Sequence, residues 1–167
     1  MTKSKSGVRV APVEPVEFED EFVAAMTQLF NDDMPFNRLM GVKLTSFKPD
    51  RVTARLEMTP GLVGHRAYNR LHGGVISATL DGVGGMAVLA AIGARHMDEP
   101  IAQRMQRYAK LGTIDLRIDY LRPGIGDYFE LEGEVLRLGS RVASARMAFR
   151  GADGTLLSVG SAAYIIS

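Results

Sequence analysis

One long apolar segment constrains the fold of this chain more than any other stretch. Residues 69–92 read NRLHGGVISATLDGVGGMAVLAAI, with a single carboxylate, Asp81. The apolar residues surround a helix on all sides instead of forming one stripe, which predicts a central, buried helix. A carboxylate and several glycines in mid-segment are unusual for a membrane-spanning helix, so we expect the core of a folded domain.

Asp81 is unexpected in such a helix, because burying an ionised carboxylate without partners costs several kcal/mol. Two interpretations are open. Asp81 is either a structural acid that accepts hydrogen bonds from a neighbouring loop, or a catalytic base or nucleophile.

The helix is preceded by His72, Gly73 and Gly74. His72 either leads the chain into the helix or takes part in catalysis. The two glycines form either a tight entry turn or a set of bare backbone N–H groups at a helix N-terminus, where the helix dipole favours negative charge. Each of these signals is weak by itself.

The spacing between these groups is informative. Asp81 lies eight residues after Gly73, which is about 10–12 Å along a helix axis. An oxyanion donor and a water-activating base must both lie within about 3 Å of one reacting centre. If both groups are catalytic, we therefore expect a site shared between two subunits, with the amide from one helix and the carboxylate from the other.

Composition narrows the class of protein. With 167 residues and 46% hydrophobic residues, the chain has the size of a single domain with a substantial core. We assign this domain to residues 17–167 and predict a flexible arm at residues 1–16, which show no periodicity. A net charge of +1 gives no argument for a nucleic-acid or membrane partner.

The content of cysteine and histidine bears on metal binding and on the compartment. The chain has no cysteine, and its three histidines lack the spacing of a zinc site. We therefore expect no metal and a cytoplasmic location, since the N-terminus also lacks the apolar region of a secretory signal.

The remaining segments predict an α+β fold. Residues 17–31 have the periodicity of a short amphipathic helix, and residues 93–111 are a polar excursion with a short helix around 101–109. Alternating apolar and polar residues predict strands at 42–48, 51–58, 112–121, 128–138, 142–150 and 155–166. Short turns join most of them, so we expect an antiparallel sheet of about six strands wrapped around the one long helix, the last four strands forming a meander.

The strand at 112–121 contains one feature that bears on function. Its alternation places Thr113 on one face with Asp115 and Arg117, and Ile114 on the other face, toward the helix.

Three segments together resemble the PaaI-like hotdog-fold acyl-CoA thioesterases, and in particular their YigI-type branch. They are MPFNRLMGV from residue 34, LHGGVISATLD at 71–81 and LGTIDLRIDYLRPG at 111–124. The resemblance covers roughly residues 20–167. It implies a hotdog fold and an enzyme of fatty acid metabolism that hydrolyses medium- and long-chain acyl-CoA without a cofactor. It also implies a homodimer that forms the site, and a dimer of dimers, which is a homotetramer.

The resemblance also implies roles for individual residues. Asp81 activates water or attacks directly, and the Gly73 amide polarises the thioester carbonyl. Thr113 orients the water, and His72 shapes the turn. The residues expected to contact substrate are Asn69, Gly74, Phe36, Arg122 and Arg141.

The sequence departs from the family pattern at one place. Members often carry an asparagine six or seven residues before the histidine, where this chain has Arg66 and His65. The nearest asparagine, Asn69, is only three residues before His72.

Two other functions are consistent with the same fold. One is a hotdog enoyl-CoA hydratase or dehydratase, although such enzymes usually pair a carboxylate with a catalytic histidine, whereas His72 precedes two glycines suited to an exposed amide. The other is a non-catalytic module that binds acyl-CoA. Asp81 argues against that function, because a binding module has no use for a carboxylate beside a thioester.

Overall fold

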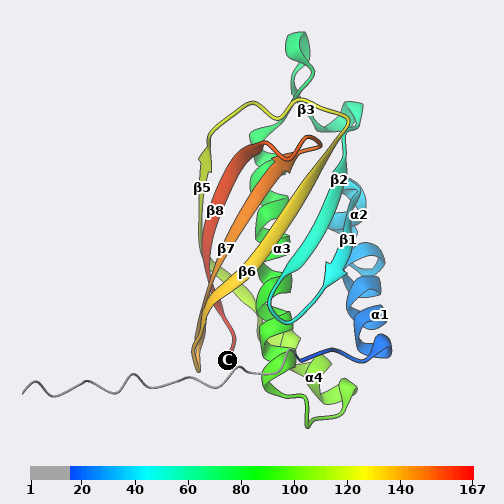
Figure 1. The fold of residues 1–167 in the computed structure, drawn as a ribbon, viewed down its shortest axis with the longest axis vertical. Coiled ribbons are helices and arrows are strands. Elements are labelled where there is room, and N and C mark those ends of the chain that lie inside the picture. The colour runs from blue at the N-terminus through cyan, green and yellow to red at the C-terminus, as the bar shows by residue number, and fades with distance from the viewer. Residues whose placement is uncertain (1–15) are drawn as a thin grey trace, which may run out of the picture.

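One long helix, α3 (Gly73–Arg95), packs against a six-stranded antiparallel sheet in the computed structural model (Figure 1). The structure describes residues 16–167, so the predicted arm, apart from Val16, lies outside the described residues. The predicted α+β arrangement, one long helix with a sheet wrapped around it, is confirmed.

The six strands follow one another across the sheet in an order that differs from their order in the chain. From edge to edge they are β1 (Val42–Phe47), β2 (Val52–Glu57), β6 (Tyr128–Leu138), β7 (Val142–Gly151), β8 (Leu156–Ile165) and β5 (Gly112–Tyr120). Every predicted strand is present, and its ends lie within one residue of those predicted. β1 and β5 are the two edges of the sheet.

The prediction that the last four strands form a meander is wrong for β5, which pairs with β8 and not with β6. The connection after β5 is not a tight turn. The backbone N–H groups of Leu121 and Arg122 both donate to the carbonyl of Leu157, at 2.9 and 3.0 Å, and Met58 N–H donates to Asp127 O at 2.7 Å. The connection thus runs across the end of the sheet, past β8 and β7, from the edge strand β5 to the start of β6.

The helices and short elements complete the chain. The predicted N-terminal helix is present as α1 (Asp20–Gln28), and the polar excursion contains α4 (Ile101–Arg107), also as predicted. The others are a π-helical turn (Leu29–Asp33), α2 (Pro35–Met40), 3-10 turns (Pro60–Leu62, Arg66–Tyr68 and Tyr108–Lys110), and the strands β3 (Val63–His65) and β4 (Arg70–Leu71). β3 and β4 form a small hairpin that is not among the strands predicted from the sequence, because two- and three-residue strands are too short to show alternation.

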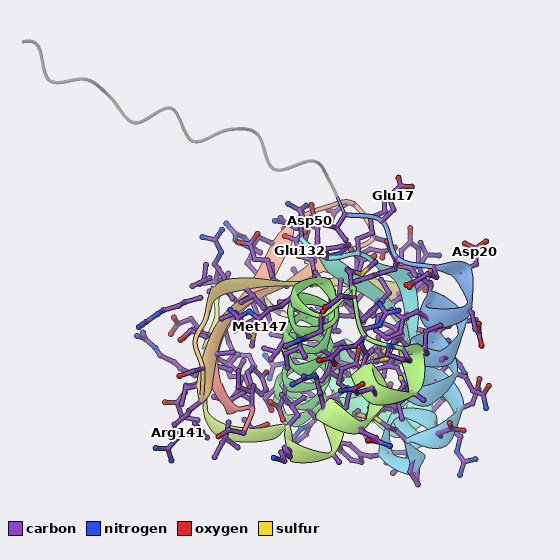
Figure 2. All side chains as sticks on the ribbon, turned by 90° about the horizontal axis from the view of Figure 1, so that it is seen from below. Glu17, Asp20, Asp50, Glu132, Arg141 and Met147 are labelled. Atoms are coloured by element: carbon purple, nitrogen blue, oxygen red, sulfur yellow. The ribbon has the colours of Figure 1, made fainter. Side chains whose placement is uncertain are left out.

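Seen along its axis in Figure 2, α3 lies between the sheet on one side and α1 with α2 on the other. By length and composition alone, α3 could span a membrane. However, 67% of its most apolar 18-residue stretch is buried inside the fold. Residues 83–90 are buried without a break. Nearer its start the burial is incomplete, and Gly74, Ser77, Ala78 and Asp81 form a partly exposed stripe at intervals of three and four residues.

Two adjacent glycines of α3 are expected to respond differently to alanine. A Cβ at Gly84 would lie 2.8 Å from the Met147 sulfur and would overlap the Tyr164 hydroxyl, whereas a Cβ at Gly85 would meet Leu111 at an ordinary 3.5 Å. We expect Gly84→Ala to lower the free energy of unfolding by about 1–3 kcal/mol. Gly85→Ala should leave it unchanged or raise it by up to about 1 kcal/mol. Urea denaturation of the two variants measures the difference, and equal midpoints would contradict this packing.

Candidate active site

Asp81 and Thr113 are in direct contact. Asp81 lies on the partly exposed stripe of α3, and its side chain faces the first residues of β5. The Thr113 hydroxyl lies 3.0 Å from Asp81 Oδ1 and 3.2 Å from Oδ2, so it donates to the carboxylate. The structure therefore brings together two of the residues that the sequence proposes for catalysis.

Thr113 reaches Asp81 because β5 contains a β-bulge. Against β8, Thr113 pairs with Tyr164 and Asp115 pairs with Ala163, so Ile114 is the extra residue between them. A bulge inverts the alternation of side chains that precede it. The predictions that Thr113 shares a face with Asp115 and that Ile114 faces the helix are therefore wrong, and Ile114 is 54% exposed.

A third residue of this cluster, Tyr164, was missed by the sequence analysis. Its hydroxyl lies 2.9 Å from the Asp81 backbone carbonyl and 3.2 Å from Asp81 Oδ1. Burial raises the pKa of Tyr164, and the negative charge of Asp81 raises it further, so the phenol stays protonated and acts as a donor. With the hydroxyl of Thr113, Tyr164 fixes the orientation of the carboxylate.

The start of α3 presents one free amide. His72 is the N-cap, and its Nδ1 accepts the N–H of Gly74 at 2.9 Å, while the N–H groups of Val75 and Ile76 donate to the His72 carbonyl. Within residues 16–167, the Gly73 N–H has no acceptor. This donor lies at the positive end of a long helix dipole, as an oxyanion-binding group requires.

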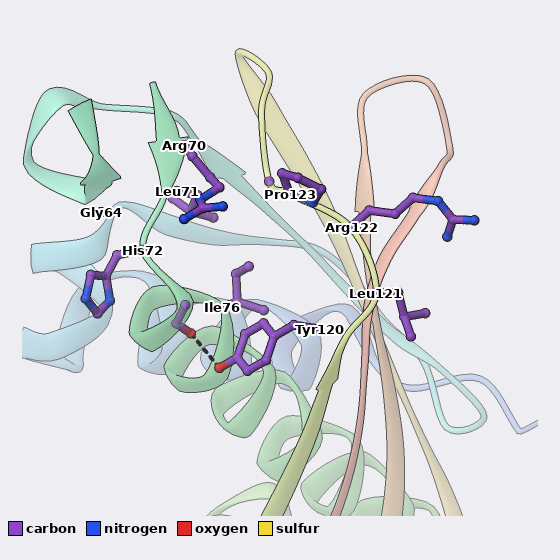
Figure 3. Close-up of a pocket in the computed structure, with 11 residues that line it drawn as sticks. Gly64, Arg70, Leu71, His72, Ile76, Tyr120, Leu121, Arg122 and Pro123 are labelled. Atoms are coloured by element: carbon purple, nitrogen blue, oxygen red, sulfur yellow. Dashed lines mark hydrogen bonds between the residues drawn. The ribbon is translucent and has the colours of Figure 1, made fainter. Parts of the chain in front are cut away.

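A cavity of about 500 Å³ lies beside this amide (Figure 3). Gly73 and Tyr120 line it, and the Tyr120 hydroxyl donates to the Gly73 carbonyl at 2.9 Å. Its charged lining residues are Arg70 and Arg122, and no carboxylate is among the residues that line it. The cavity is therefore suited to an anionic ligand.

The two arginines lie differently in Figure 3. Arg70 points toward the space between His72 and Pro123, whereas Arg122 extends away from the Tyr120 hydrogen bond and donates to the Leu156 carbonyl at 2.9 Å. Sequence reasoning missed Arg70 as a site residue, because no motif or periodic pattern includes it.

A second cavity of about 370 Å³ meets the first at His72, which lines both. Its walls are mostly apolar and come from α2, the turn after β2 and the start of α3. They include Phe36, Leu39, Met40, Leu62, Gly74, Val75 and Ala78. Phe36 is 57% exposed and Leu39 is 79% exposed, so an apolar ligand would cover side chains that otherwise face water.

Two predicted substrate contacts lie elsewhere in the protomer. Asn69 occupies a left-handed turn between β3 and β4, with φ of 46°, and lines a separate cavity with Met58 and Thr59. Arg141 lies beside Ile166, just beyond the end of β8, whereas Arg122 lies beside Leu156, where β8 begins. The two arginines therefore sit at opposite ends of the sheet, and Figure 2 shows Arg141 at the rim.

The side chains and the amide brought together here are of a kind that can act on an acyl compound. No cluster of three or more His, Asp or Glu side chains that could hold a metal ion occurs in the described part of the chain. A carboxylate oriented by two hydroxyls and a free amide at a helix N-terminus are the groups that hydrolysis of an activated acyl compound requires.

A long helix wrapped by a six-stranded antiparallel sheet, with a carboxylate on the helix and a glycine amide at its start, defines a hotdog-fold hydrolase. A family model described as the thioesterase superfamily matches residues 68–158. The chain belongs to the thioesterase superfamily and is a thioester hydrolase.

Individual relatives agree with this assignment. The chain is 34% identical to the medium/long-chain acyl-CoA thioesterase YigI of Escherichia coli K12, over 83% of this chain and 90% of the relative. A crystal structure of a Shewanella oneidensis protein related to the thioesterase superfamily is 37% identical, with a TM-score of 0.84, over 88% of this chain and 96% of that one. Mouse thioesterase superfamily member 2, at 19% identity and a TM-score of 0.68 over 87% of this chain and 97% of that one, shares the fold.

Proposed function

We propose that this protein hydrolyses medium- to long-chain acyl-CoA to the free acid and CoA. The E. coli relative is named for that activity. The site has two halves, a carboxylate half (Asp81 with Thr113) and an amide half (Gly73 with Tyr120). The observation that carries the proposal is that one strand contacts both halves. β5 contacts Asp81 through Thr113 near its beginning and contacts Gly73 through Tyr120 at its end.

The same observation supports a shared site in a homodimer. β5 is an edge strand with unpaired backbone groups, and two of its side chains, Ile114 and Tyr120, are each 54% exposed. Antiparallel pairing of two β5 strands about a two-fold axis brings the Thr113 end of one strand beside the Tyr120 end of the other. Each Asp81 then faces the partner subunit's Gly73, which one helix cannot achieve across about 12 Å.

In this site the groups have distinct roles. The Gly73 N–H donates to the thioester carbonyl oxygen and stabilises the charge that develops on it. Asp81 of the other subunit activates a water molecule or attacks the carbonyl carbon itself. Thr113 holds the carboxylate and orients the water, and His72 caps the helix so that the amide of Gly73 remains free.

The two cavities that meet at His72 suggest how the substrate lies. We propose that the acyl chain enters the apolar cavity along Phe36 and Gly74, and that the CoA phosphates meet the basic cavity at Arg70 and Arg122. Antiparallel pairing of β5 also brings the partner subunit's Arg141 toward this rim. We further propose that two such dimers form a tetramer in the cytoplasm.

Thiol release from a panel of acyl-CoA substrates of increasing chain length tests the proposed function. We expect turnover to be highest with medium and long chains. Release from short chains alone would contradict the proposed specificity, and release from none would contradict the activity. If no acyl-CoA releases thiol, an absorbance assay of crotonyl-CoA hydration would identify a hydratase.

A further inference from the structure

The peptide unit between Gly73 and Gly74 is held at both of its polar ends by side chains. The Tyr120 hydroxyl, from the end of β5, donates to the carbonyl of this unit at 2.9 Å (Figure 3). The N–H of the same unit donates to His72 Nδ1, also at 2.9 Å.

The two glycines make room for these two side chains. A Cβ at Gly73 would lie 3.3 Å from Tyr120 Cε1, and a Cβ at Gly74 would lie 2.9 Å from His72 Nδ1. Each glycine is therefore approached by one of the side chains that hold the peptide. The absence of a Cβ at both glycines therefore allows the two side chains to approach closely enough to form these hydrogen bonds.

The two hydrogen bonds restrict a backbone that would otherwise be flexible, because two successive glycines allow many conformations. An oxyanion donor is effective only when its direction is set before the charge develops. Gly73 supplies the free N–H, and its own carbonyl is the group that Tyr120 holds. Fixing that carbonyl limits rotation at Gly73, and the amide on its other side then keeps its direction.

We infer that Tyr120 is a positioning residue, whose hydroxyl orients the Gly73 amide toward the thioester carbonyl by holding the Gly73 carbonyl and takes no part in the reaction itself. The inference rests on the proposed function. It adds to the site a residue on β5 that belongs to the amide half, whereas Thr113 on the same strand belongs to the carboxylate half.

Tyr120→Phe tests this role, since it removes the hydroxyl and keeps the ring that lines the cavity. Loss of one neutral hydrogen bond at the amide should lower kcat by about tenfold. KM should stay within about twofold, because the ground-state contacts of the substrate are unchanged. Tyr128→Phe, the same deletion on β6, is the control and should match the wild type. An unchanged kcat in Tyr120→Phe, or a raised KM at constant kcat, would overturn the role.

Mixed dimers identify the half-site on which Tyr120 acts. In a heterodimer of Tyr120→Phe with Asp81→Asn chains, one site keeps an intact amide half and an intact carboxylate half, so the rate should exceed the mean of the two parents. In a heterodimer of Tyr120→Phe with Gly73→Pro chains, both amide halves are impaired, so no gain is expected. A gain in the second mixture would overturn the assignment to the amide half.

The wild-type rate separates the two possible failures. If the wild type releases thiol and Tyr120→Phe does so equally fast, only the role of Tyr120 fails. If the wild type releases no thiol from any acyl-CoA, the proposed function fails, and the role of Tyr120 fails with it.

Discussion

Asp81→Asn is expected to lower kcat for acyl-CoA hydrolysis by about 10³-fold, the middle of the range for loss of a general base. Asparagine has the same shape as aspartate and keeps an oxygen that can accept from Thr113 and Tyr164, so the fold should be retained. The side-chain amide can neither take a proton from water nor attack the carbonyl. Steady-state thiol release and a thermal melt of the same sample measure the two effects separately.

Two control variants give this result its meaning. Thr113→Val removes only the hydroxyl that holds the carboxylate, and we expect a smaller loss of about tenfold in kcat. Asp50→Asn makes the same change at an exposed residue after β1 and should have no effect. Wild-type turnover in Asp81→Asn would make Asp81 a structural acid, which is the other interpretation that the sequence leaves open.

The central helix and the strands could be predicted from the sequence because their signals are local. The apolar segment around Asp81 has helical length, and the strands alternate clearly. The pairing of β5 with β8 could not be predicted in this way, because it joins residues that are far apart in the chain, such as Thr113 and Tyr164. The assumption that a short connection joins neighbouring strands gave β6 as the neighbour of β5, whereas the neighbour is β8.

The candidate site was predicted in part for a similar reason. Asp81 and Gly73 stand out as a carboxylate and a glycine in an apolar segment, but the strand residues do not. The bulge at Ile114 has no sequence signature, so alternation assigned Thr113 to the wrong face. Tyr120 and Tyr164 read as ordinary members of alternating strands, and only their hydroxyl contacts distinguish them.

Gly73→Pro is expected to lower kcat by about 10²–10³-fold relative to Gly73→Ala, as the loss of an oxyanion donor does. Gly73 is the first residue of α3, where proline is well tolerated, and His72 has the extended conformation that precedes proline, with ψ of 133°. Proline removes the N–H. Alanine keeps it and adds a Cβ at the same place, 3.3 Å from the Tyr120 ring. The ratio of the two rates therefore isolates the amide from the steric change.

The same variant tests whether the site is shared. Gly73→Pro and Asp81→Asn homodimers should both turn over very slowly, but a heterodimer contains one site with an intact amide and an intact carboxylate. Random association of equal amounts should restore about a quarter of the wild-type rate, since half of the dimers would carry one working site of two. A site within one subunit predicts no recovery, because each chain then lacks one of its own groups. Recovery in co-expressed chains would thus place Asp81 across the dimer interface from the amide it works with.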